Sequence, residues 1–83
     1  VMHKDKVINV MRMKAREYRK RVGGDYTFRI ATWNLRLDME KEHPEHQWTA
    51  PQLRIILTEL QHDGLVEKCK HESRIGQAVW KLL

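Results

Sequence analysis

The chain has 83 residues, enough for one small domain whose core needs nearly every large apolar side chain. Its one cysteine excludes an internal disulfide, and no apolar run approaches the roughly 20 residues that a membrane-spanning helix requires. The net charge of +5 is concentrated in the first 22 residues, which carry eight basic and two acidic side chains, whereas the remainder carries eight basic and nine acidic ones.

The first segment, KDKVINVMRMKAREYRKRVGG, predicts a helix over residues 5–21 that ends before Gly23 and Gly24. Two faces of this helix differ in character. The expected core face holds Val7, Met11, Ala15, Tyr18 and Val22, and a second face holds Arg12, Arg16 and Arg19. The arginine face is either a contact for phosphate groups or simply a solvated surface.

The second segment is ambiguous between strand and helix. The β-rich run YTFRI predicts a short strand near residues 26–29, and a helix is expected over residues 30–41, ending before Pro44. Apolar residues at Ile30, Trp33 and Leu37 fall on a different helical face from Leu35 and Met39. This helix is therefore expected to pack on two sides or to share an interface with a partner.

The third segment carries the clearest local signals, and they predict a helix over residues 50–63. Thr49 is a suitable N-cap, and Gln52 three residues later completes a capping box. Pro51 fits the first turn, and Gly64 fits the C-terminal cap. The apolar stripe of this helix is Leu53, Ile56, Leu57 and Leu60.

Two runs with strand character, LVEKCKH and QAVWKLL, flank the polar connection ESRIG and predict a β-hairpin over residues 65–83. The stretch TAPQLRIILTELQHDGLVEK…VWKLL resembles the recognition helix and wing of the winged helix-turn-helix superfamily. The resemblance covers about the last 35 residues closely and the first half by order of elements. It implies one α+β domain over residues 1–83, with three helices and a C-terminal hairpin wing.

The resemblance also implies a function in DNA binding, with helix 50–63 entering the major groove. On that helix Gln52 would contact adenine, Arg54 guanine, and Ile55 or Thr58 a thymine methyl group. The hairpin and the first helix would contact the phosphate backbone. The full set of expected DNA-binding residues is Thr49, Gln52, Arg54, Ile55, Thr58, Lys68, Lys70, Arg74, Arg12 and Arg16.

Sequence patterns for an enzyme, a metal site or a cofactor are absent. Cys69 and the histidines lack the paired spacing of a structural zinc site, and His43 and His46 are interpreted as solvated loop residues. The Gly23–Gly24 pair is not a nucleotide-binding loop, and no catalytic constellation stands out. We therefore expect a non-enzymatic protein without a bound metal or cofactor.

The favoured prediction is a sequence-specific binder of double-stranded DNA, such as a small transcriptional regulator. It is expected in the cytoplasm, associated with the nucleoid, or in the nucleus of a eukaryote. The alternative is a winged-helix module for protein interaction or dimerisation, because Glu40, Glu42 and Glu45 crowd the turn before helix 50–63. In that case the second helix or the face around Ile55 would contact the partner. A homodimer is the expected assembly of the DNA-binding protein as well, because the second helix has apolar residues on two sides and a two-fold protein would bind a palindromic site.

Overall fold

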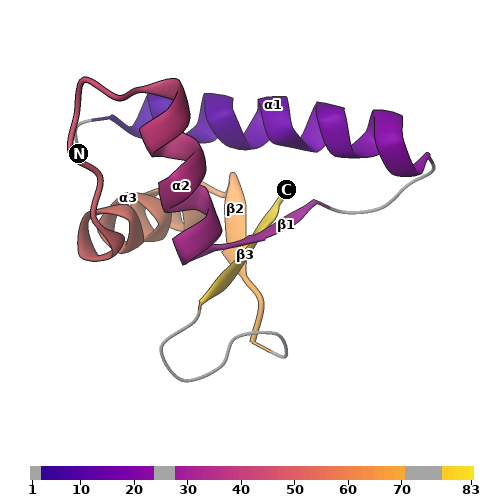
Figure 1. Ribbon diagram of the computed structural model, residues 1–83. Helices are drawn as coiled ribbons and strands as arrows, with labels where there is room; N and C mark the ends of the chain where they lie inside the picture. Colours follow the sequence, from indigo (N-terminus) through magenta and orange to yellow (C-terminus); the bar gives the residue numbers. More distant parts are fainter. Residues whose placement is uncertain (1–2, 24–27, 71–77) are drawn as a thin grey trace.

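The computed structural model describes residues 3–23, 28–70 and 78–83, and it contains three helices and a small three-stranded antiparallel sheet (Figure 1). The elements in chain order are α1 (Lys4–Val22), β1 (Arg29–Ala31), α2 (Thr32–Glu42), α3 (Ala50–His62), β2 (Val66–Lys68) and β3 (Val79–Leu82). The predicted α+β class is confirmed, and this arrangement is compatible with a winged-helix layout.

The last strand, β3, lies in the middle of the sheet between β1 and β2. Ile30 of β1 is paired with Trp80, and Val66 of β2 is paired with Leu82, in both cases antiparallel. The C-terminal hairpin is thus confirmed in its two strands, and β1 supplies a third strand beside it. The predicted strand near residues 26–29 is displaced in the structure to residues 29–31, and residues 24–27 lie outside the described part of the chain.

The start of α2 differs from the predicted helix over residues 30–41. Ile30 and Ala31 pair with β3, so the helix begins only at Thr32. The Thr32 backbone N–H donates to the Ala78 carbonyl at 2.9 Å, and the Thr32 hydroxyl donates to the same carbonyl at 3.1 Å. These bonds join residues 46 positions apart, and helical periodicity contains no sign of them.

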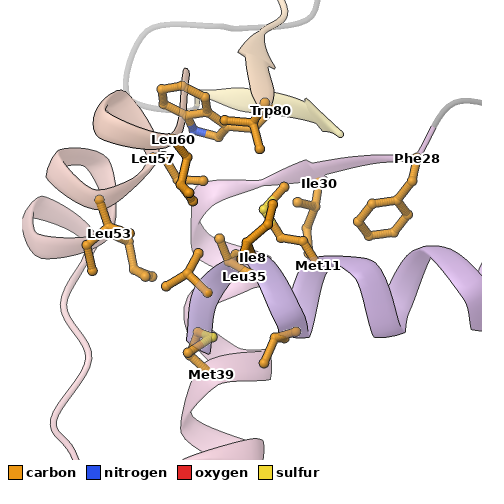
Figure 2. Close-up of a cluster of buried hydrophobic side chains, with 14 of the residues drawn as sticks. Ile8, Met11, Phe28, Ile30, Leu35, Met39, Leu53, Leu57, Leu60 and Trp80 are labelled. Atoms are coloured by element: carbon orange, nitrogen blue, oxygen red, sulfur yellow. The ribbon is translucent and has the colours of Figure 1, made fainter. Parts of the chain in front are cut away.

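The hydrophobic core collects side chains from all three helices and from the sheet. Figure 2 shows this cluster, with Ile8, Met11, Phe28, Ile30, Leu35, Met39, Leu53, Leu57, Leu60 and Trp80 labelled. Each large apolar side chain that leaves water in this way stabilises the fold by about 1.5–3 kcal/mol. Thr32 is buried within the core without a polar penalty, because its oxygen also accepts a bond from the Trp80 indole N–H at 2.9 Å.

Helix α1 packs on the core through most of the face that the sequence predicts. Val7, Met11 and Ala15 are buried, and Tyr18 is half-buried with its ring edge against Phe28. The prediction was wrong for Val22, which is 47% exposed. The apolar pattern of α1 continues to its last turn, but the burial of that face does not extend as far as Val22.

Helix α3 (Ala50–His62) is closed by Gly64, as the sequence predicts. This residue has φ of +80°, a conformation that glycine adopts without a steric penalty. The N–H of Leu65 donates to the Leu60 carbonyl and the N–H of Gly64 to the Gln61 carbonyl, both at 3.0 Å, which is a Schellman cap. The cap turns the chain directly into β2, so the position of the hairpin follows from the end of α3.

Candidate nucleic-acid interface

The beginning of α3 is fixed by the predicted cap at Thr49. Its hydroxyl oxygen accepts a bond from the Gln52 backbone N–H at 3.3 Å, and Pro51 occupies the first turn. The reciprocal half of the capping box is not formed. The Gln52 side chain instead contacts Nε2 of His46, with its amide nitrogen 2.9 Å and its amide oxygen 3.2 Å away. Two of the expected DNA-binding residues, Thr49 and Gln52, are thus engaged within the protein.

The outward face of α3 lies opposite its buried leucine and isoleucine stripe. Arg54, Ile55 and Thr58 are exposed on this face, with Ile55 at 61%. The Thr58 hydroxyl donates to the Arg54 carbonyl at 2.7 Å, which turns its hydrogen-bond donor inward. No ion pair of the described residues includes Arg54. The structure therefore brings three expected residues together, and Arg54 is the one that offers a charged donor to a partner.

The hairpin is tied to α3 by a contact that sequence reasoning missed. The Gln61 side-chain oxygen accepts a bond from the Lys68 backbone N–H at 2.8 Å. This bond places the end of β2 beside the last turn of α3, with the Lys68 and Lys70 side chains exposed. Arg74, the third expected residue of the hairpin, lies in residues 71–77, outside the described part of the chain.

The acidic residues around α2 and α3 are partly neutralised by neighbouring bases. Glu40 forms an ion pair with Arg36 at 2.9 Å, and Glu45 lies 3.7 Å from the Lys6 ammonium. Asp63 forms an ion pair and hydrogen bond with Lys4, and this bond raises the pKa of the Lys4 ammonium above its ordinary value. Three carboxylates around α2 and α3 are thus paired with basic side chains of the same chain.

Three rings of the loop before α3, those of His43, His46 and the buried Trp48, form a cluster with the ring of His3, which precedes α1; we call it the His–Trp cluster. The His3 and His46 rings have centroids 4.4 Å apart, and the His46 ring lies 4.5 Å from Trp48 in an edge-on arrangement. The Trp48 indole N–H donates to the His43 carbonyl at 3.0 Å. The interpretation of His43 and His46 as solvated loop residues was wrong, since both are half-buried against this tryptophan.

Protonation of His3 is opposed by its surroundings. Desolvation lowers the pKa of His3, and the neighbouring His46 and Lys6 lower it further. The pKa of the Glu45 carboxyl is also lowered, first by a hydrogen bond from its own backbone N–H and then by the nearby His43 and Lys6. The described residues contain no group of three His, Cys, Asp or Glu side chains that could hold a metal ion.

Two further observations concern other surfaces. Arg12 and Arg16 are exposed on α1, an element separate from α3 and the hairpin. On α2, Trp33 and Leu37 are 49% and 47% exposed, and their spacing of four residues places them side by side on one helical face. Leu35 and Met39 on the other side of α2 are buried, so the apolar pattern of this helix is divided between core and surface.

The chain matches none of the family models, curated proteins or solved structures with which it was compared. What the structure defines by itself is an α+β domain with three helices and a three-stranded antiparallel sheet. No described helix has the length and apolar character needed to cross a membrane.

Proposed function

We propose that this chain is a winged-helix protein that binds double-stranded DNA through the outward face of α3 and the β2–β3 hairpin. The observation that carries the proposal is the position of Arg54. It is exposed on the outward face of α3, it has no ion pair among the described residues, and the hairpin beside that face exposes Lys68 and Lys70.

The division of roles follows from the chemistry of each side chain. Arg54 would donate two parallel hydrogen bonds to O6 and N7 of guanine in the major groove. Ile55 and the methyl group of Thr58 would contact a thymine methyl group. Lys68 and Lys70 would bind phosphate, which positions the protein but does not distinguish sequences.

The residues at the start of α3 have a supporting role in this proposal. Thr49 caps the helix, and Gln52 contacts His46, so both hold the orientation from which Arg54 reaches a base. For Gln52 to read adenine directly, it would have to give up its contact with His46. A direct contact between Gln52 and a base is therefore not part of the proposal.

A binding titration with a sequence selected from random duplexes, and with a scrambled duplex of equal length, tests the proposal. Arg54→Ala should lose about 1–3 kcal/mol for the selected duplex and relax the preference at one base position. Lys70→Ala should weaken both duplexes equally and reduce the slope of log K against log salt by about 0.9. Arg36→Ala is a matched control, since that arginine is paired with Glu40 on α2.

The proposal is contradicted if Arg54→Ala, Ile55→Ala and Thr58→Ala all leave the ratio of the affinities for the selected and the scrambled duplex unchanged.

A protein-interaction function would then be the better explanation. The specific observation in its favour is the exposed pair Trp33 and Leu37 on α2. A protein-interaction function through this pair predicts a homodimer, which light scattering at high micromolar concentration would detect. Trp33→Ser should convert this dimer to a monomer.

A further inference from the structure

Six of the eight basic residues of α1 fall into two groups with different environments, and the other two, Lys20 and Arg21, are exposed at its C-terminal end. Each of three lysines lies within ion-pair distance of a carboxylate: Lys4 pairs with Asp63, Lys6 lies 3.7 Å from Glu45, and Lys14 lies 3.8 Å from Asp38 and 3.6 Å from Glu17. In contrast, Arg12, Arg16 and Arg19 are all exposed, and no ion pair of the described residues includes them. Lys4, Lys6 and Lys14 attach α1 to the rest of the fold. Arg12, Arg16 and Arg19 remain available to a partner.

The three arginines form one continuous surface, the arginine stripe, defined by Arg12, Arg16 and Arg19. Their spacing of four and then three residues places them on the same helical face. At a rise of 1.5 Å per residue they extend over about 10.5 Å. Duplex DNA carries one negative charge per roughly 1.7 Å of its axis, so a stripe of this length can face several phosphates at once.

The later part of α1, which carries Arg16 and Arg19, projects away from the elements proposed above to bind DNA. In Figure 1 the second half of α1, which carries Arg16 and Arg19, extends to the right, away from α3 on the left and from the hairpin below. Between α1 and α3 lies the hydrophobic core, to which both helices contribute buried faces. Over the dimensions of this domain DNA is stiff, with a persistence length of about 50 nm, so a duplex bound along α3 would not bend back to the stripe.

We infer that the arginine stripe binds the phosphate backbone of a second duplex, so that one copy of the chain bridges two DNA segments. The inference rests on the proposed function, because the first duplex is held by α3 and the hairpin. Binding at the stripe depends on charge and not on base sequence, since α1 offers guanidinium groups to phosphate without entering a groove.

A capture experiment with the full chain tests this inference. One duplex is fixed to beads, the protein is added, and a second, fluorescent duplex is recovered on the beads at about 0.15 M salt, where charges more than roughly 8 Å apart are largely screened. The variant Arg12→Glu/Arg16→Glu should bind the first duplex within about threefold of the wild-type affinity. Its recovery of the second duplex should fall by about tenfold or more.

A matched control distinguishes the stripe from total charge. Arg16→Glu and Arg21→Glu change the net charge equally, but Arg21 lies on a different face of α1. Recovery of the second duplex should fall for Arg16→Glu and persist for Arg21→Glu. Circular dichroism and urea unfolding establish that each variant keeps the fold.

Four outcomes contradict the inference. If the wild type binds no duplex, the proposed function fails as well. If it binds the first duplex but recovers no second one, only the bridging inference fails. If Arg12→Glu/Arg16→Glu loses both duplexes in parallel, the stripe belongs to a single binding site. If that variant still recovers the second duplex, the bridge forms by association of two protein copies and not through α1.

Discussion

The two halves of α1 belong to one continuous helix but have different relations to the rest of the molecule. In the first half, Val7 and Met11 are completely buried, and the lysines pair with carboxylates on α2, on the loop after it and after α3. In the second half, residues 16–22 are all described and none of them is buried. The first half is part of the core, whereas the second half packs against the core through Tyr18 and exposes residues 16, 17 and 19–22 to solvent or to a partner.

This difference shows that a regular apolar pattern identifies a helix without determining how much of it is covered. Most of the stability of a helix in a protein comes from packing of its apolar face and not from intrinsic propensity. Val22 continues the pattern of Val7 and Met11, but it is 47% exposed whereas those two are fully buried. We therefore expect the fold to depend on the first half of α1, and the capture of a second duplex to depend on the exposed arginine stripe.

The largest expected effect is at Trp48, which anchors the His–Trp cluster beside the first half of α1. Trp48→Ala should lower the free energy of unfolding by about 3–5 kcal/mol, because it removes a side chain that is only 2% exposed. The matched control is Trp33→Ala on α2, which should cost less than about 1 kcal/mol, since that ring is 49% exposed. Urea unfolding followed by circular dichroism measures the free energy of unfolding of both variants. Equal losses for Trp48→Ala and Trp33→Ala would contradict the burial of Trp48 and the exposure of Trp33.

A second pair of substitutions compares the two halves of α1 directly. Met11→Ala should cost about 2–5 kcal/mol, because the side chain is fully buried between the helices. Val22→Ala should change stability by no more than about 0.5 kcal/mol. A large loss at Val22, measured in the same urea titrations, would mean that the second half of α1 is covered in solution.

A smaller effect is expected at the cap of α3. Thr49→Ala removes the acceptor of the Gln52 backbone N–H and should cost about 1 kcal/mol. Thr49→Ser retains the hydroxyl and should preserve most of the stability. An unchanged unfolding midpoint for Thr49→Ala would show that the helix does not depend on this cap.

The smallest effect is a dependence on pH from the His–Trp cluster. The pKa of His3 in the folded protein is lowered below its ordinary value of about 6.5, so the unfolded chain binds the proton more strongly. The contribution of neutral His3 to the free energy of unfolding is therefore fully present above about pH 6.5. It is lost as the pH falls from there through the lower pKa of the folded protein. Urea midpoints between pH 7.5 and 5 should decrease, with a shallower decrease for His3→Asn.

Asparagine is a suitable replacement at this position because His3 has φ of 72°, which asparagine tolerates. If His3→Asn and the wild type show the same dependence on pH, the proximity of the His3 and His46 rings has no energetic consequence.

The sequence predicted α3 and the hairpin well because their signals are local. The cap at Thr49, the apolar stripe and Gly64 lie within 16 consecutive positions, and the structure places the helix within one residue of the prediction. The start of α2 was not predictable in this way. Thr32 becomes the first helical residue because β1 pairs with a strand almost 50 positions later.

The candidate interface was predictable in its exposed positions and not in its internal contacts. Helical periodicity placed Ile55 and Thr58 on the outward face and Arg54 at its flank, and all three are exposed in the structure. The diversion of Gln52 to His46 was missed, because it depends on the path of the preceding loop. The bond from Lys68 to Gln61 was missed as well, although glutamine in the last turn of a helix that leads into a strand is a signal that could have indicated it.

An NMR titration with duplex DNA tests most directly whether α3 and the hairpin form the primary binding surface. On addition of one equivalent of a selected duplex, the largest amide shifts should occur between Arg54 and His62 and at Lys68–Lys70. Shifts around Arg16 should follow only with excess duplex, while amides near Met11 should change little throughout. Shifts that are largest around Trp33 and Leu37, or that begin at the arginine stripe and never reach Arg54, would contradict this assignment.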